Sequence, residues 1–321
     1  MKWKQEELSV LNLYRDGTKT IEQIRSYLKK SGYKRTYKSV ARKLESLNIK
    51  KPLSNYSNID LPKILILDIE TTPMGVWTWS LGKQYVGHHA IMKNKNGAMM
   101  DWHLLSWSAK WLYDSEVISD VLTPREAKAR NDKRIMKSVW KLLNEADIII
   151  AHNGDRFDLR KINARFIAND IKAPLPFKTI DTLKQARREF AFSSHKQDFI
   201  TKFLKLEEKL DTEFQLWIDC MSGNQEALDR MEKYNRGDVI GLEDMYLKLR
   251  PYMKSHPNIA VMIDDDCCTV CGSNQLKATK KFYYTGSSRY RLYTCNSCHS
   301  PYIRSKNSES NKEIAKRSVS R

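Results

Sequence analysis

Two carboxylates stand at the end of an apolar segment near residue 70. Asp68 and Glu70 follow the run Ile64–Leu67, and prolines bound the segment at Pro62 and Pro73. A continuous apolar run of this length predicts a buried strand, in which side chains two residues apart point to the same face. Two like charges beside apolar surroundings are costly unless a cation neutralises them. The segment therefore predicts a divalent metal ion on carboxylate oxygens, or else two carboxylates that reach solvent beyond the strand.

Further polar residues occupy comparable places later in the chain. The run Ile148–Ala151 predicts a second buried strand, and Asp158 stands at the start of the amphipathic helix that follows it. In an open α/β sheet, active sites form beyond the ends of such strands. A long helical pattern over Glu226–Leu249 places Tyr234 and Asp238 at positions i and i+4, on one face of the helix.

These three groups occur in an order that is typical of one class of enzymes. Asp-x-Glu follows the first strand, Asn-x-x-x-Phe-Asp follows the second, and Tyr-x-x-x-Asp lies in the late helix. Together they resemble the exonuclease motifs of DEDDy 3′–5′ exonucleases in the ribonuclease H-like (DnaQ-like) superfamily. The resemblance runs from Lys63 to Leu249 and is greatest to stand-alone, often phage-encoded relatives of the proofreading domain of family B DNA polymerases. It implies an α/β fold, with a ribonuclease H-like mixed sheet flanked by helices.

The resemblance also implies a role for each matching residue. Two Mg²⁺ or Mn²⁺ ions would be held by Asp68, Glu70, Asp158 and Asp238. Tyr234 would orient or help to activate the attacking water, and Thr71 and Asn153 would contact the terminal nucleotide. Two metal ions can serve both ends of an in-line displacement at phosphorus, and carboxylates suit such hard cations, whereas Cys and His would favour zinc.

Basic residues are concentrated at the two ends of the chain. The net charge is +18, of which residues 1–50 carry +8 (13 Lys/Arg, 5 Asp/Glu) and residues 267–321 carry +9 (11 Lys/Arg, 2 Asp/Glu). The segment between them is nearly neutral. Basic ends of this kind attract polyanions, and nucleic acid is the expected partner. A basic protein without such a partner is the alternative.

The first 50 residues show helical spacing in three short blocks. The outer face of the third block carries Arg35, Lys38, Arg42 and Lys43. The segment resembles helix-turn-helix domains of the homeodomain-like class, whose third helix enters the major groove of DNA. The alternative is a protein-docking bundle with a solvated basic face. Residues 51–61 are rich in Pro, Ser and Asn and are expected to form a linker.

The C-terminal region contains two Cys-x-x-Cys pairs, which are formed by Cys268, Cys271, Cys295 and Cys298. This spacing predicts a zinc ribbon over residues 267–303, with one tetrahedral structural Zn²⁺ on four thiolates. Cys267 and His299 are adjacent alternatives as ligands. A disulfide framework is disfavoured in a reducing cytosol. Tyrosines between the pairs alternate with cations, as in single-strand binders, and those cations are Lys280, Lys281, Arg289 and Arg291.

The chain is thus expected to contain three functional parts. A nuclease domain over residues 62–250 follows the first linker, and residues 251–266 form a second linker before the ribbon. Residues 304–321 are expected to be a disordered basic tail. Trp77 and Trp79 could stack on a base, but buried aromatic residues are the stronger expectation for them.

The most consistent function is a metal-dependent 3′–5′ exonuclease that acts on DNA in replication, proofreading or repair. No residues remain for a polymerase, so a polymerase or replication protein would be a separate partner. The alternatives are an exoribonuclease on the same fold and a non-catalytic DNA-binding regulator. The apolar runs are too short to span a membrane and the N-terminus does not resemble a signal peptide, so a cytoplasmic location is expected, in the host if the protein is phage-encoded.

Overall fold

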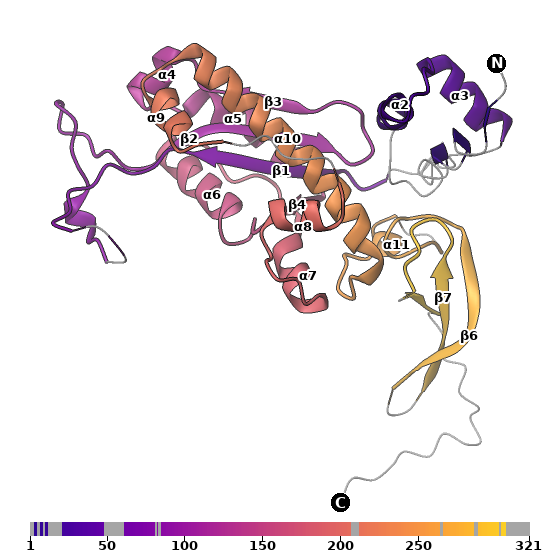
Figure 1. Cartoon of the computed structure of the whole chain (residues 1–321). Coiled ribbons are helices and arrows are strands. Elements are labelled where there is room, and N and C mark those ends of the chain that lie inside the picture. Colours follow the sequence, from indigo (N-terminus) through magenta and orange to yellow (C-terminus); the bar gives the residue numbers. More distant parts are fainter. Residues whose placement is uncertain are drawn as a thin grey trace, which may run out of the picture.

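The structure is a computed structural model of the chain, shown in Figure 1. It describes residues 3–4, 7–8, 10–11, 21–47, 61–80, 82, 85–206, 212–263, 266–285, 288–301 and 303–305. Within these residues no helix is long and apolar enough to cross a membrane.

A five-stranded mixed sheet forms the centre of the molecule. Its strands are β1 (Ile64–Thr71), β2 (Leu104–Trp111), β3 (Ile118–Val121), β4 (Ile148–Ala151) and β5 (Lys178–Asp181). Their order is β3-β2-β1-β4-β5, with antiparallel pairing from β3 to β1 and parallel pairing from β1 to β5. The two strands predicted from apolar runs are confirmed as β1 and β4. Strand β5 was not predicted, because only two of its four residues are buried.

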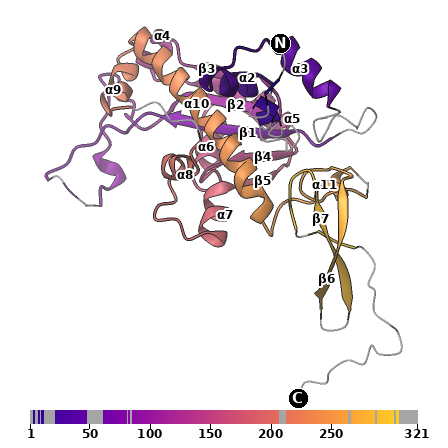
Figure 2. The same cartoon turned by 45° about the vertical axis from the view of Figure 1, so that its right-hand side comes forward.

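Helices cover both faces of this sheet (Figures 1 and 2). They are α4 (Pro124–Ala129), α5 (Lys133–Glu145), α6 (Asp158–Ala168), α7 (Thr182–Glu189), α8 (Gln197–Phe203), α9 (Gln215–Met221) and α10 (Gln225–Leu249). Leu65 and Leu67 of β1 belong to a buried cluster with α5 and α6, whereas Ile66 packs in a second cluster with α8 and α10. Alternate residues of the central strand therefore supply the two halves of the core.

Helix α10 lies over a polar face of β2. That face carries Ser106, Ser108 and Lys110, which are all buried. The Ser106 hydroxyl donates to Asn235 Oδ1 at 3.2 Å, and Lys110 Nζ lies 2.7 Å from Glu243 Oε2. The small serines let the helix backbone come close to the strand, and the two polar contacts fix the position of α10 along it.

Two smaller units flank the sheet. On the N-terminal side, α2 (Ile21–Lys30) and α3 (Tyr37–Ser46) pack around a cluster of buried aliphatic residues. The first of the three helices expected there falls mostly on residues outside the described part of the chain. The capping segment of the second begins outside it too, so the three-helix module stays a prediction.

On the C-terminal side, strands β6 (Leu276–Tyr284), β7 (Arg289–Cys295) and β8 (Ile303–Arg304) form an antiparallel sheet. The segment expected as the second linker contains most of η2 (Arg250–Tyr252) and all of α11 (Ile259–Met262). Ile259 is buried in the cluster that contains the C-terminal half of α10. This segment therefore packs the C-terminal unit against the central domain.

Between β1 and β2, the described residues of the range 72–103 leave the sheet as a projecting arm, coloured purple in Figures 1 and 2. The arm includes η1 (His88–Ala90). Trp77 is 71% exposed and Trp79 is fully exposed. The expectation that these tryptophans are buried is therefore wrong, because the chain here leaves the sheet and does not continue along it.

The buried ion pair between Lys110 and Glu243 predicts a measurable stability effect. Lys110→Met leaves the Glu243 carboxylate buried without its cation, and we expect it to lower the free energy of unfolding by about 3–5 kcal/mol. The double variant Lys110→Met/Glu243→Gln removes both charges and keeps an acceptor for the Tyr113 N–H, which now lies 3.1 Å from Glu243 Oε1. Urea unfolding should show that it recovers most of the loss. An equal loss in both variants would contradict this account.

Candidate active site and metal centres

Three of the predicted carboxylates meet at the end of β1. One oxygen each from Asp68, Glu70 and Asp238 lies within 4.8 Å of the others. Asp68 and Glu70 face the same side of β1 and are half-buried, and Asp238 is buried in α10. Carboxylate oxygens are the ligands that Mg²⁺ and Mn²⁺ prefer, so this cluster could hold a divalent metal ion.

Asn235 fixes the orientation of Asp68. It is fully buried in α10, one helical turn before Asp238, and its Nδ2 donates to Asp68 Oδ2 at 2.6 Å. Its Oδ1 accepts the hydrogen bond from Ser106, so its amide orientation is defined from both sides. Asn235 was not among the residues predicted for the site, although its i, i+3 spacing to Asp238 places both on one helix face.

Asp158 approaches the cluster from a third element. The turn before it brings Gly154 so close to Ala151 that a Cβ on the glycine would lie 2.4 Å from Ala151 Cβ. Asp158 then opens α6, is 3% exposed, and its Oδ1 accepts a hydrogen bond from Ile69 N at 3.2 Å. Ile69 stands between Asp68 and Glu70, so Asp158 lies beside the cluster without belonging to the set of three.

Burial makes the Asp158 carboxyl group a weaker acid than usual. Loss of water raises its pKa to about 7, and the neighbouring charge of Asp181 adds to this effect. Hydrogen bonds from backbone N–H groups, including that of Ile69, act in the opposite direction. A nearby divalent cation would favour the ionised form, which is the form that binds metal.

Asp181 is a second site residue that was not predicted. It ends β5 and caps α7, accepting hydrogen bonds from Leu183 N at 3.0 Å and Lys184 N at 3.3 Å. The same oxygen accepts from Asn153 N at 3.0 Å, and Asn153 has a left-handed backbone with φ of 68°. Asp181 thereby holds the turn that leads to Asp158.

The remaining predicted active-site residues lie around this end of the sheet. Tyr234 is 9% exposed, and its ring forms a T-shaped pair with the Trp217 ring, with centroids 6.2 Å apart. It stands one helical turn before Asp238, as the spacing predicts. Thr71 is the last residue of β1 and is half-buried. The structure thus gathers residues from β1, α6 and α10 at one end of the sheet.

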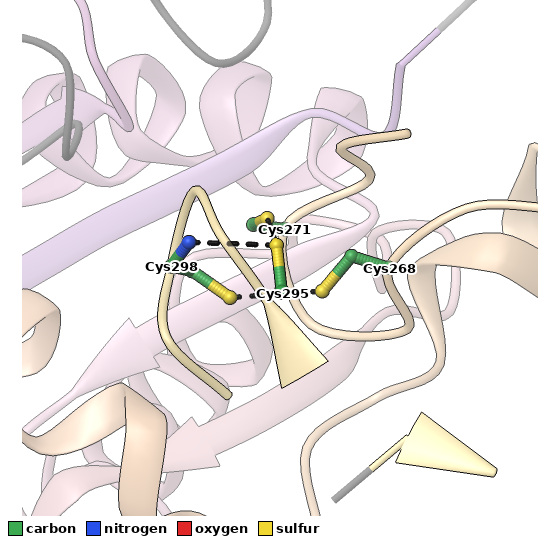
Figure 3. Close-up of side chains that lie close together, drawn as sticks. All are labelled: Cys268, Cys271, Cys295 and Cys298. Carbon is green, nitrogen blue, oxygen red and sulfur yellow. Dashed lines mark hydrogen bonds between the residues drawn. The ribbon is translucent and has the colours of Figure 1, made fainter. Parts of the chain in front are cut away.

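The four cysteines of the two Cys-x-x-Cys pairs form a separate cluster, shown in Figure 3. The Sγ atoms of Cys268 and Cys298 are 3.6 Å apart, and those of Cys271 and Cys295 are 3.7 Å apart. Disulfide sulfurs would be about 2.0 Å apart. Thiolates around a tetrahedral zinc ion, each about 2.3 Å from it, would be about 3.8 Å apart. The cluster therefore fits a four-thiolate metal site.

The two alternative ligands lie outside this cluster. The Cys267 Sγ donates to the carbonyl of its neighbour Cys268 at 3.8 Å, and His299 is exposed. Backbone N–H groups point at the cluster sulfurs: Ser297 N lies 3.3 Å from Cys295 Sγ, and Val270 N lies 3.4 Å from Cys268 Sγ. Such donors favour thiolates, which are the metal-binding form.

Arg250 connects the cysteine cluster to the central domain. It is 2% exposed, its Nη1 donates to the Tyr113 hydroxyl at 2.5 Å, and it shares a pocket lining with Cys271. The pKa of the Cys298 thiol is lowered, chiefly by the hydrogen bond from Cys268 and to a smaller extent by the charge of Arg250. A metal ion on four thiolates carries net negative charge, so a buried guanidinium suits this position.

The predicted nucleic-acid contacts are placed unevenly. Arg35 is 9% exposed and pairs with the buried Glu7 at 2.7 Å, so it stabilises the N-terminal unit and does not present its charge to a ligand. Arg42 is exposed and Lys43 half-exposed on α3, whereas the Lys38 side chain lies outside the described part. Among the C-terminal cations, Lys280 and Lys281 are exposed.

Two arginines of the C-terminal hairpin form cation–π contacts with the ring of Phe282. The guanidinium carbons of Arg289 and Arg291 each lie 4.8 Å from the centroid of Phe282. Tyr283 and Tyr284 beside it are exposed. This hairpin therefore presents tyrosines and lysines to solvent and uses Phe282 to hold its two arginines.

Comparison with known families agrees with this architecture. A family model of the RNase H superfamily matches residues 111–250, from the last residue of β2 to the residue after α10. The fold is RNase H-like. The match includes Asp158, Tyr234 and Asp238 but begins after Asp68 and Glu70. Members of this superfamily are generally nucleic-acid hydrolases that use divalent metals. A search of curated proteins finds no match.

Asp158 predicts a pH dependence of stability in the RNase H-like domain. The folded pKa of about 7 lies above the ordinary 3.8, so the folded protein binds the Asp158 proton more tightly than the unfolded chain does. The stability that this proton gives is complete below about pH 3.8 and is lost as the pH rises through 7. In buffer without added Mg²⁺ or Mn²⁺, Asp158→Asn should gain stability over the unchanged protein between about pH 5 and pH 7. The gain should be about 1.4 kcal/mol per pH unit. Thermal unfolding of both proteins would measure it, and a pH-independent difference would contradict the assignment.

The cysteine cluster predicts a defined metal content. Cys271→Ser should reduce the bound metal from about one ion per chain to near zero, because one of four thiolates is lost. Cys267→Ser is the matched control and should keep the ion. Elemental analysis of the purified proteins would identify the metal and its amount. Retention in Cys271→Ser together with loss in Cys267→Ser would show that the ligand set is different.

Proposed function

We propose that the protein is a metal-dependent 3′–5′ exonuclease acting on DNA. The observation that carries this proposal is the convergence of Asp68, Glu70 and Asp238, which come from two elements far apart in the sequence, within 4.8 Å. Asp158, the fourth carboxylate of the motif order, is hydrogen-bonded to the strand that carries two of them. The RNase H-like fold supports nuclease chemistry in general terms.

The donor set suits two divalent metal ions. When bound, such ions supply a hydroxide nucleophile at neutral pH and stabilise charge on the leaving oxygen. The chain's own part is to hold carboxylates in place before substrate arrives. Asn235 orients Asp68, and the Ile69 N–H orients Asp158. Tyr234, one turn before Asp238 on α10, is our candidate for orienting the attacking water.

DNA as the substrate is supported by the motif order and by the charge distribution. The three motifs resemble those of proofreading exonucleases, and both ends of the chain are strongly basic. Exposed cations on α3 and on the C-terminal hairpin would bind phosphates without reading sequence. We further propose a role in replication, proofreading or repair, beside a separate polymerase or replication protein. The C-terminal cysteines would hold one structural Zn²⁺.

The decisive test is a time course on a 5′-labelled single-stranded DNA oligonucleotide. It compares Mg²⁺, Mn²⁺ and chelator, with an RNA of the same sequence alongside. We expect a metal-dependent ladder that shortens from the 3′ end on DNA. Asp68→Ala should lower kcat by at least about 100-fold while leaving DNA binding intact, because it removes a metal ligand but neither basic end.

Asp229→Ala is the matched control, because it removes an exposed carboxylate from the same helix as Asp238. Cleavage that survives Asp68→Ala at saturating Mg²⁺ would remove the metal assignment. A ladder on RNA alone would reassign the substrate. Binding of DNA without cleavage under any metal would favour a regulatory protein.

A further inference from the structure

The arm between β1 and β2 begins beside the carboxylate cluster. Glu70 is a member of the cluster, β1 ends at Thr71, and the chain then leaves the sheet until it returns at Leu104. Figures 1 and 2 show the arm projecting beyond the ends of both strands. Anything bound along it would therefore lie next to a substrate held at the carboxylates.

Contacts at its base hold the arm in place. The Thr72 hydroxyl lies 3.0 Å from His103 Nδ1, and both residues are buried. Lys161 of α6 places its Nζ 3.8 Å from the centroid of the Trp102 ring. Because α6 begins at Asp158, this contact ties the arm to the same helix that supplies the fourth carboxylate.

Backbone hydrogen bonds also hold the arm together farther from the sheet. Gly75 N donates to Met100 O at 2.9 Å, Met92 N donates to Gly75 O at 2.8 Å, and Trp77 N donates to Ala90 O at 2.9 Å. A Cβ on Gly75 would lie 3.3 Å from Met100 Cβ, so the segments are closely packed there. The arm is thus a folded projection that presents its side chains from defined positions.

Its surface combines large aromatic side chains with positive charge. Trp77, Trp79 and Tyr85 are mostly or fully exposed. Residues 72–103 contain three lysines and one acidic residue, Asp101, and Lys93 and Lys95 are exposed. Soluble proteins rarely expose such aromatic groups together without a partner. Aromatic rings interleaved with cations are how proteins bind single strands, with bases stacking on rings and phosphates meeting cations.

We infer that this arm binds the single-stranded DNA behind the 3′ end, with bases stacked on Trp77, Trp79 and Tyr85. The inference rests on the proposed exonuclease function and adds a second binding surface to it. Trp77 is seven residues from Glu70, so the chain places it at most about 25 Å away. A strand of several nucleotides held at the carboxylates can span that distance. Because the arm projects away from the sheet (Figures 1 and 2), we expect a dinucleotide to make few contacts with it.

The test compares steady-state cleavage of an oligonucleotide of about 20 nucleotides with cleavage of a dinucleotide. Trp77→Ala/Trp79→Ala should raise KM for the oligonucleotide by at least about 25-fold, since each stacked base is worth about fivefold or more. Its kcat and its activity on the dinucleotide should stay unchanged. Trp77→Phe/Trp79→Phe keeps two rings and should restore most of the affinity.

Tyr252→Ala is the matched control, because Tyr252 is another exposed aromatic residue and lies beyond the far end of α10. Unchanged oligonucleotide KM in the double alanine variant would overturn the inference, as would an equal loss on the dinucleotide. If the unchanged protein cleaves neither substrate, the proposed exonuclease function fails. Fluorescence anisotropy with the labelled oligonucleotide then tests by itself whether the arm binds DNA. Weaker binding by the alanine variant, restored by phenylalanine, supports the arm, and equal binding overturns it.

Discussion

Negative charge gathered at one end of the central sheet is the constraint on which the rest of the structure depends. Asp68, Glu70 and Asp238 lie within a few ångströms of one another, and Asp158 is buried beside them. Withdrawing carboxylates from water costs several kcal/mol each unless hydrogen bonds or a cation compensate. Hydrogen bonds to Asp68 and Asp158 provide part of that compensation, and a bound divalent cation would provide the rest.

The polar face of β2 is what allows the charges to meet. An apolar face with large side chains would hold α10 farther from the sheet, whereas Ser106 and Ser108 add little bulk. The contacts of Asn235 and of Glu243 lie on either side of Asp238 along α10. They therefore determine both the distance of α10 from the sheet and its position along β2. Stability in this part of the core depends on paired polar groups, which are costly when one partner is lost.

The sequence predicted the elements with strong periodicity and the residues with a marked spacing. Strands β1 and β4 and the long helix α10 are confirmed, and the four cysteines cluster as their spacing indicated. The groups that orient the site were missed, because Asn235 and Ser106 are 129 positions apart and no local pattern links them. The exposed Trp77 was misjudged for a related reason, since hydrophobicity does not tell whether a chain follows the sheet or leaves it. Arg35 shows the converse error, because a cation on a predicted basic face is used by a buried partner, Glu7.

One helix links the carboxylate cluster to the cysteine cluster. Arg250 directly follows α10, twelve residues after Asp238, which corresponds to about 18 Å along a helix. At that end Arg250 lines the same pocket as Cys271, while nearer its middle the helix is held to β2 by Asn235 and Glu243. Because these inner contacts do not involve the cysteine unit, loss of a metal ion bound by the cysteines would affect the far end of α10 and leave Asp238 in place. The two centres are therefore joined in one body but stabilised by separate contacts, so each can be removed without dismantling the other.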